Sequence, residues 1–272
     1  MKAPIGIFDS GYGGLTILKE IIAELPEYDF LYLGDNARAP YGTRSFDIVY
    51  DFTLEAVNAL FDKGCPMVIL ACNTASAKAL RSIQQKDLPL MDPAKRVLGV
   101  IRPSTELVGS LTKSKHVGIL ATQGTVSSNS YVLEIEKSNP DITVSQRACN
   151  MWVPLIENNC FETAGGRFFI QQDVEALLFN DPLIDTIILA CTHYPVVQAI
   201  IEEFVPNHVK VIAQGPIVAE SLKAYLLRHP AMNDSLSKNN ERVFITTETP
   251  SSFDKNASLI FGSAIQSEHI VL

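Results

Sequence analysis

The chain has 272 residues, enough for two domains that each bury a core of their own. Hydrophobic residues make up 47% of it, which fits a soluble α/β protein, and no apolar run is long enough to span a membrane. A net charge of −8 and the lack of a basic cluster disfavour nucleic-acid binding as a main role.

The five cysteines show no spacing typical of a disulfide framework. The N-terminus enters an apolar strand at once and has no basic segment followed by a long apolar one, so a secretory signal is not expected. Together these features predict reduced thiols and a cytoplasmic location.

The first expected strand, residues 5–8, leads into a glycine-rich turn, Asp9-Ser10-Gly11-Tyr12-Gly13-Gly14. Apolar residues at helical spacing follow as far as Leu25. A turn of this kind can form a nest of N–H groups for an anion, or it can be only a tight turn. The glycines do not match the dinucleotide or phosphate-loop signatures, so both interpretations stay open.

The next segments also alternate between strand and helix. Residues 30–33 form a strand that opens into the irregular loop around Pro40-Tyr41-Gly42. Ser45 is expected to cap a helix, and residues 68–71 form the strand that leads to Cys72. A helix is expected at 74–83, and a loop at 87–95, which is polar and contains two prolines.

The rest of the chain continues the alternation. Further strands are expected at residues 96–101, 117–120, 142–147, 186–190, 209–213 and 243–246. Helices are expected from Pro103 and at residues 130–137, 167–179 and 217–227, a polar turn at 122–128, and a mobile surface loop at 229–241. This alternation predicts an α/β protein with two open parallel sheets.

A short pattern occurs twice. Leu-Ala-Cys ends an apolar strand at Cys72 and again at Cys191, 119 positions later, and residues 5–11 resemble residues 117–123, 112 positions later. The similar offsets indicate a duplicated α/β unit. Parallel α/β folds bind ligands at such strand ends, and a following helix N-terminus favours a thiolate. With pseudo-two-fold symmetry, two cysteines can face one cleft from opposite sides, which suits moving a proton from one face of a carbon to the other.

Other interpretations compete at each of these residues. Buried cysteines are often inert, and we keep that interpretation for Cys65, Cys149 and Cys160. A zinc site is disfavoured, because Cys-x-His is not a recurring metal spacing and no Cys-x-x-Cys occurs. His193 is a proton relay or a core histidine. Asp9 can simply cap its turn, and Glu157 is either a surface acid or a cleft acid.

Several motifs together resemble the glutamate racemase family. The resemblance runs in order over nearly the whole chain. It is carried by residues 9–14, 40–42, 71–76, 153–157 and 191–195. Aspartate racemases, the close relatives, typically carry a histidine where Ser76 stands and Thr-Glu where this chain has Thr192-His193, so the glutamate branch is favoured. The family commonly has an aspartate in the turn that is Ala213-Gln214-Gly215 here, which leaves the role of this turn open.

The resemblance implies a cofactor-independent enzyme that needs no metal and racemises glutamate, in which Cys72 and Cys191 exchange the Cα proton. It implies tuning or relay roles for Asp9, Glu157 and His193. The substrate-binding residues that it implies are Asp9, Ser10, Tyr41, Gly42, Asn73, Thr74, Thr192 and His193. It also implies a cleft between a domain of residues 1–98 plus 213–272 and a domain of residues 99–212, a homodimer, and a supply of D-glutamate for peptidoglycan.

Two alternatives remain at this point. A racemase of aspartate or of another amino acid would use the same chemistry. A two-domain solute-binding protein would share the interdomain cleft, although it would have no need for paired thiols and would usually be exported.

Overall fold

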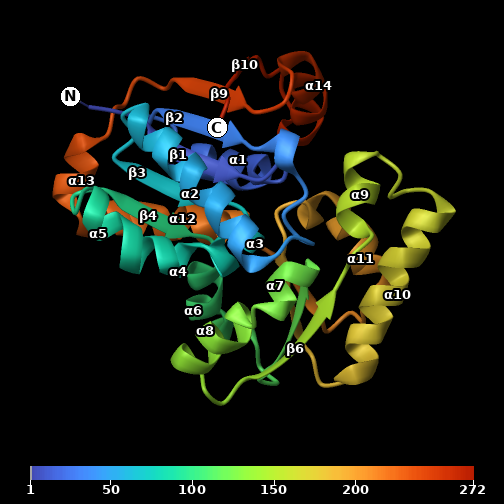
Figure 1. Ribbon diagram of the computed structural model, residues 1–272. Helices are drawn as coiled ribbons and strands as arrows, with labels where there is room; N and C mark the ends of the chain where they lie inside the picture. The colour runs from blue at the N-terminus through green and yellow to red at the C-terminus, as the bar shows by residue number, and fades with distance from the viewer. Residues whose placement is uncertain (1) are drawn as a thin grey trace.

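The computed structural model describes residues 2–272, which form two parallel β-sheets, each with helices on both faces (Figure 1). The first sheet has six strands in the order β10-β9-β2-β1-β3-β4. Its strands are β1 (Ile5–Asp9), β2 (Phe30–Gly34), β3 (Met67–Leu70), β4 (Arg96–Gly99), β9 (Arg242–Thr246) and β10 (Ser267–His269). The second sheet has four strands in the order β6-β5-β7-β8. Its strands are β5 (His116–Ala121), β6 (Thr143–Ala148), β7 (Thr186–Ala190) and β8 (Lys210–Ala213).

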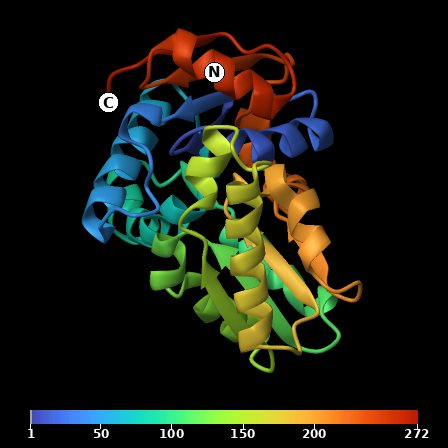
Figure 2. The same cartoon turned by 90° about the vertical axis from the view of Figure 1, so that its right-hand side faces the viewer.

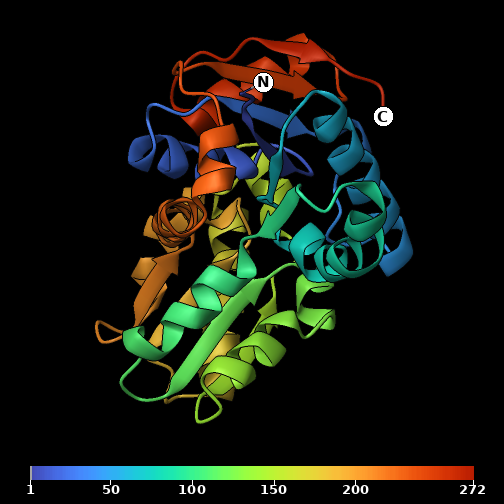
Figure 3. The same cartoon turned by 90° about the vertical axis from the view of Figure 1, so that its left-hand side faces the viewer.

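The two sheets share one topology. The order β2-β1-β3-β4 in the first sheet matches β6-β5-β7-β8 in the second, strand for strand along the chain. This match confirms the prediction of two similar parallel-sheet domains. Strands β9 and β10 then extend the first sheet beyond β2, so the end of the chain lies beside its beginning, red beside blue in Figure 1. Figure 3 shows the same arrangement from another side, with the green segment below. The predicted boundaries between the two domains, at residues 98/99 and 212/213, stay a prediction.

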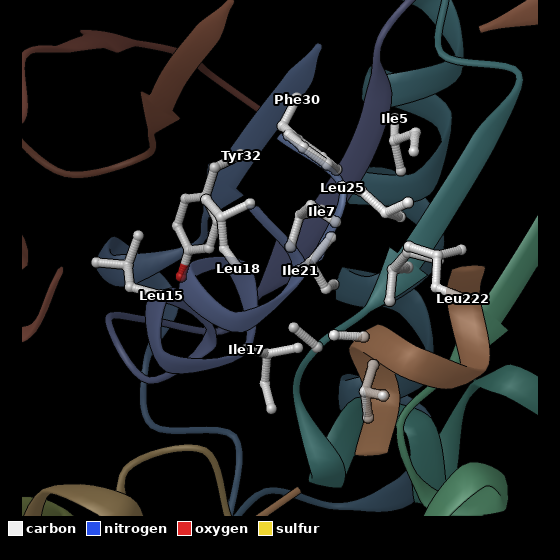
Figure 4. Packing of buried hydrophobic residues seen from close by; sticks show 14 of the residues in the cluster. Ile5, Ile7, Leu15, Ile17, Leu18, Ile21, Leu25, Phe30, Tyr32 and Leu222 are labelled. Atoms are coloured by element: carbon white, nitrogen blue, oxygen red, sulfur yellow. The ribbon is translucent and has the colours of Figure 1, made fainter. Parts of the chain in front are cut away.

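Side chains alternate between the two faces of the first sheet, as the two-residue period of a strand requires. On β1, Ile5 and Ile7 join one buried cluster, whereas Phe8 joins the other. Figure 4 shows the first cluster, in which the β1 and β2 side chains pack against α1 (Gly14–Glu24) and Leu222. Burying an aliphatic side chain of this size contributes about 1.5–3 kcal/mol. These clusters hold the strands whose carboxyl ends form the site.

Helices cover the remaining faces. α2 (Phe46–Asp62) covers the second face of the first sheet, and α10 (Ala164–Asn180) lies in front of the second sheet in Figure 2. The other helices of eight or more residues are α6 (Ile101–Leu111), α8 (Ser130–Ser138), α12 (Gly215–Arg228) and α14 (Pro250–Phe261). The shorter ones are η1 (Asn36–Arg38), α3 (Asn73–Lys78), α4 (Leu80–Ser82), η2 (Ile83–Asp87), α5 (Leu88–Met91), α7 (Gln123–Ser127), α9 (Trp152–Glu157), η3 (Tyr194–Val197), α11 (Gln198–Phe204) and α13 (Pro230–Ser235).

The chain passes between the two sheets twice. The first crossover runs from β4 through Val100 into α6, and the second runs from β8 through Gln214 into α12. α12 packs against both α1 and α6. The two crossovers are therefore in contact where the domains join.

Four expected segments differ from the structure. Residues 87–95 are not all loop, because the helical segment that runs through α4 and η2 continues into α5, which contains Pro89. Residues 122–128 are not a plain turn, because Thr122 caps α7 by accepting the Thr125 N–H. The strand expected at 96–101 ends at Gly99, and α6 begins at Ile101.

The predicted mobile loop at 229–241 is also wrong. It contains α13, and Leu236 is fully buried and bridges to Ala3. The Asp29 carboxylate accepts the N–H groups of Asn239 at 2.8 Å and of Glu241 at 2.9 Å. A polar composition suggested mobility, but these long-range contacts anchor the segment.

Candidate active site

A cavity of about 90 Å³ lies between the carboxyl ends of the strands of the two sheets, and we call it the cleft cavity. Of the predicted site residues, every one except Asp9 lines it: Ser10, Tyr41, Gly42, Cys72, Asn73, Thr74, Glu157, Cys191, Thr192 and His193. Both cysteines therefore face one cavity, one from each domain. This is the arrangement that the duplicated pattern predicts.

Cys72 is the N-cap residue of α3 and lies two residues after the end of β3. Its backbone is extended, and its Sγ accepts the Ala75 N–H at 3.4 Å, so the thiol itself caps the helix. Ser10 Oγ lies 3.4 Å from the same sulfur. Burial, followed by the nearby Asp9 carboxylate, raises the pKa of the Cys72 thiol to about 12. At neutral pH this cysteine is therefore a neutral thiol.

Cys191 has different neighbours. The expected helix does not begin directly after it, because η3 starts only at Tyr194. Instead, His193 Nδ1 lies 4.0 Å from Cys191 Sγ, and His193 Nε2 lies 2.9 Å from Glu157 Oε1. Burial by itself lowers the pKa of His193, but hydrogen bonds to Cys191 and Glu157 outweigh it and raise the pKa to about 10. The imidazole is therefore a cation at neutral pH, beside Cys191.

Asp9 lies beneath the cleft cavity and connects the two domains. Its Oδ1 accepts the Gly11 N–H at 2.8 Å, and its Oδ2 accepts the Thr192 hydroxyl at 3.3 Å. Its pKa is raised by burial, although the His193 cation and these donors act against the rise. A buried carboxylate thus lies between the two cysteine regions.

The glycine-rich turn allows close packing of the two domains. A Cβ on Gly13 would lie 2.2 Å from Thr192 Oγ1 and 2.5 Å from His193 Nδ1. A Cβ on Gly14 would lie 2.5 Å from the Asp9 Cβ. Gly13 is therefore required for the close approach of the second domain, and Gly14 for the close packing of the start of α1 against Asp9.

The loop around Tyr41 meets the second domain on the other side of the cavity. The Tyr41 hydroxyl donates to the buried Asp35 carboxylate, which also binds Arg38. The Gly42 carbonyl accepts the Gly124 N–H at 2.7 Å. These two bonds fix the position of the loop at the wall of the cavity.

Thr74 and Asn73 have partners of their own. Thr74 Oγ1 lies 3.0 Å from Thr122 Oγ1 across the cleft. The Asn73 side chain is held by Gln214 at 2.8 Å and by the Tyr131 hydroxyl at 2.7 Å. The amide nitrogen and the amide oxygen thus each have a protein partner, which fixes the orientation of this side chain.

Further residues line the cleft cavity without having been predicted. Three of them are polar residues of the second domain, namely Thr122, Gln123 and Asn150. The internal repeat contains a signal for the first two, because residues 121–123 correspond to Asp9-Ser10-Gly11. Cys149 also lines the cavity, where its thiol donates to the Arg147 carbonyl at 3.7 Å.

A larger groove of about 700 Å³ lies elsewhere, between α4, α6, α8 and α12. Among the residues that the structure describes, none of those predicted for catalysis or substrate binding lines this groove. Within residues 2–272, no group of three or more His, Cys, Asp or Glu side chains is arranged to hold a metal ion. In the same range, no helix combines the length and apolar character needed to cross a bilayer.

Comparison with known proteins adds to this geometry. Residues 13–222 match the family model described as Asp/Glu/Hydantoin racemase. The chain belongs to this family. A glutamate racemase from Persephonella marina is 39% identical, with 98% of this chain and 97% of the relative covered.

Solved structures of racemases from the same family superpose over the whole chain. A glutamate racemase from Bacillus anthracis gives a TM-score of 0.90 at 33% identity, covering 99% of this chain and 98% of that one. A glutamate racemase from Francisella tularensis, solved in complex with D-glutamate, gives 0.86 at 33% identity, covering 100% and 97%. The family resemblance seen in the sequence motifs is thus confirmed.

Proposed function

We propose that this racemase interconverts L-glutamate and D-glutamate without a cofactor, using Cys72 and Cys191 as the two acid/base groups. The observation that carries the proposal is that two cysteines, at equivalent strand ends of a repeated topology, line one cavity. Full-length similarity to proteins named glutamate racemase supports glutamate as the substrate. Membership of a racemase family decides against the solute-binding alternative.

The chemistry needs one thiolate and one thiol. The thiolate takes the Cα proton, which breaks the C–H bond and leaves the electron pair on a planar carbon next to the carboxylate. The opposite thiol then gives its proton to the other face and becomes the thiolate. Each turnover therefore exchanges the protonation states of the two cysteines, and the reverse reaction restores them.

The surroundings of the two cysteines favour one starting arrangement. Cys72 is buried beside Asp9, which keeps it protonated. Cys191 lies beside the His193 cation, so we place the thiolate of the starting arrangement on Cys191. By family resemblance the Cys191 thiolate acts on L-glutamate and the Cys72 thiolate acts on D-glutamate. Glu157 holds His193, and Asp9 bridges to Thr192.

The polar groups around the thiols would orient the substrate. Ser10, Thr74 and Thr192, whose side chains carry hydroxyls, line the cavity together with Tyr41, Gly42 and Asn73. Holding the carboxylates and the ammonium in this way brings the Cα between the two sulfurs, and such positioning is a large part of the rate enhancement in enzymes.

The wider role rests on the same proposal. We assign the supply of D-glutamate for peptidoglycan, action as a homodimer, and a cytoplasmic location, which five free cysteines support. The domain division at residues 1–98 plus 213–272 and 99–212 belongs to the proposal as well, with the cleft cavity between the two parts.

The test is the loss of optical rotation from pure L-glutamate and from pure L-aspartate, without added cofactor. We expect glutamate to be racemised with a much higher kcat/KM, and we expect EDTA or a carbonyl scavenger to leave the rate unchanged. Comparable values for the two amino acids would indicate a broader racemase. No loss of rotation with either would contradict the proposal.

A further inference from the structure

Three buried side chains form a closed ring of hydrogen bonds behind the cleft cavity. The Asn73 amide donates to Gln214 Oε1 at 2.8 Å, and Gln214 Nε2 donates to the Tyr131 hydroxyl at 2.7 Å. The Tyr131 hydroxyl closes the ring by donating to Asn73 Oδ1 at 2.7 Å. Asn73 and Gln214 are each 2% exposed and Tyr131 is 0% exposed, so water does not compete for these bonds.

A backbone carbonyl sets the direction of this ring. Gln214 Nε2 also lies 3.0 Å from the Val100 carbonyl and 2.9 Å from Ser104 Oγ. A carbonyl can only accept, so the amide nitrogen of Gln214 must face Val100 and its oxygen must face Asn73. This orientation leaves only the nitrogen of Asn73 to face Gln214. The Val100 carbonyl therefore determines which way the Asn73 amide points.

The ring lies where the two domains join. Val100 belongs to the first crossover, Gln214 belongs to the second and is the residue just before α12, and Tyr131 comes from α8 of the second domain. Asn73 is the first residue of α3 and directly follows Cys72. One amide thus connects both crossovers to the residue beside a proposed acid/base thiol.

We propose that Gln214 is a positioning residue for Cys72. By holding Asn73, it keeps the first turn of α3 in place, and with it the Ala75 N–H that caps the Cys72 sulfur. This inference rests on the proposed function, in which Cys72 exchanges a proton with the substrate. The turn of residues 213–215, whose role the sequence left open, thereby acts on one of the two thiols and not on the other.

The test compares two ring variants with a matched control. Gln214→Leu removes the centre of the ring, and Tyr131→Phe removes one oxygen while keeping the packed aromatic ring. Ser104→Ala removes a contact outside the ring and leaves the Val100 carbonyl to orient Gln214. The first readout is elimination from each enantiomer of a glutamate carrying a leaving group on Cβ. In this reaction a thiolate takes the Cα proton and the leaving group departs with its electron pair, so the second thiol is not needed.

We expect both ring variants to lose at least about tenfold in elimination from the enantiomer that Cys72 deprotonates, with the other enantiomer within about twofold of the wild type. We expect Ser104→Ala to stay within about twofold for both enantiomers. Equal losses for the two enantiomers would indicate a general structural role for Gln214 and would overturn the inference. Wild-type elimination rates in the ring variants would also overturn it. Should Gln214→Leu fail to fold, Tyr131→Phe decides alone.

A second readout does not depend on turnover. Iodoacetamide labelling followed by peptide mass spectrometry gives the alkylation rates of Cys72 and Cys191 in the same molecule. We expect the ratio of Cys72 to Cys191 to rise at least about threefold in the ring variants, because a loosened first turn of α3 exposes the buried thiol. An unchanged ratio of alkylation rates would overturn the inference, whether or not the wild type racemises glutamate. A wild type that racemised no glutamate would contradict the proposed function instead.

Discussion

Cys72 and Cys191 occupy corresponding places in two sheets with the same strand order, but the residues around them differ. Cys72 caps a helix and lies near the buried Asp9 carboxylate, which helps to keep it neutral. Cys191 lies before a short 3₁₀ helix and beside the His193 cation, which Glu157 holds. The repeat therefore accounts for the presence of one cysteine from each sheet at the same cavity. Local residues account for their unequal electrostatics, with a buried carboxylate near Cys72 and an imidazolium cation beside Cys191.

The largest expected effect comes from removing either sulfur. Serine is a far weaker acid than cysteine, so Cys72→Ser and Cys191→Ser should each lose racemisation by about 10²–10⁴-fold or more. Each variant should still eliminate a β-leaving group from the one enantiomer whose Cα–H faces the remaining thiol, and the preferred enantiomers should be opposite. Cys160→Ser, which does not line the cleft cavity, is the control. A shared enantiomer preference would contradict the opposed-thiol mechanism.

A smaller loss is expected from the His193 side of the comparison. His193→Gln removes the cation beside Cys191, and we expect kcat to fall by about 10²-fold. Elimination from the enantiomer handled by Cys191 should fall more than elimination from the other. His116→Gln is the matched control. His116 also contacts a carboxylate, that of Asp181, but it lies at the start of β5, away from the carboxyl ends of the strands where the cleft cavity lies. Equal losses for both enantiomers would show that His193 does not act on one thiol alone.

Two of the buried aspartates, Asp9 and Asp29, should respond in opposite ways to loss of charge. Burial raises the pKa of Asp9, so at neutral pH its ionised form opposes folding, and Asp9→Asn should raise Tm while lowering kcat about tenfold. For Asp29 burial is outweighed by hydrogen bonds from Glu241, Ser237 and Asn239, so its pKa is lowered and Asp29→Asn should lower Tm. Thermal melts at pH 7 and steady-state rates check both. A lower Tm for Asp9→Asn would mean that its hydrogen bonds outweigh its burial.

The smallest expected effect is a pH dependence of stability from His193. Its pKa in the folded protein is about 10, against 6.5 for an ordinary histidine. The protonated imidazole therefore contributes its full stabilisation below about pH 6.5, and this contribution declines until the pH exceeds about 10. We expect the Tm of the wild type to fall by a few degrees relative to His193→Gln across that window. If the Tm values of the two proteins changed with pH by the same amount, the raised pKa of His193 would be contradicted.

The motifs led directly to most of the candidate site, because residues at the carboxyl ends of parallel strands converge in space. Asp9, Cys72 and Cys191 each stand at or just after such an end, and all lie at or beneath one cavity. Thr122 and Gln123 could have been found from the repeat, because they correspond to Ser10 and Gly11. The anchoring of residues 229–241 could not, because it depends on Asp29, about 210 positions away in the chain.

The sequence by itself determined the alternating strands and helices, the duplicated unit, and the two cysteines at corresponding strand ends, because these depend on local periodicity and on residues adjacent in the chain. Only the tertiary structure decided the contacts around each cysteine, because Asp9 and Glu157 reach the two cysteine regions from separate segments. It also decided that the Asn73 amide is held by Gln214 and Tyr131, 141 and 58 positions away. Burial and hydrogen bonds of this kind set the charges in the site, and they arise only when distant segments pack together.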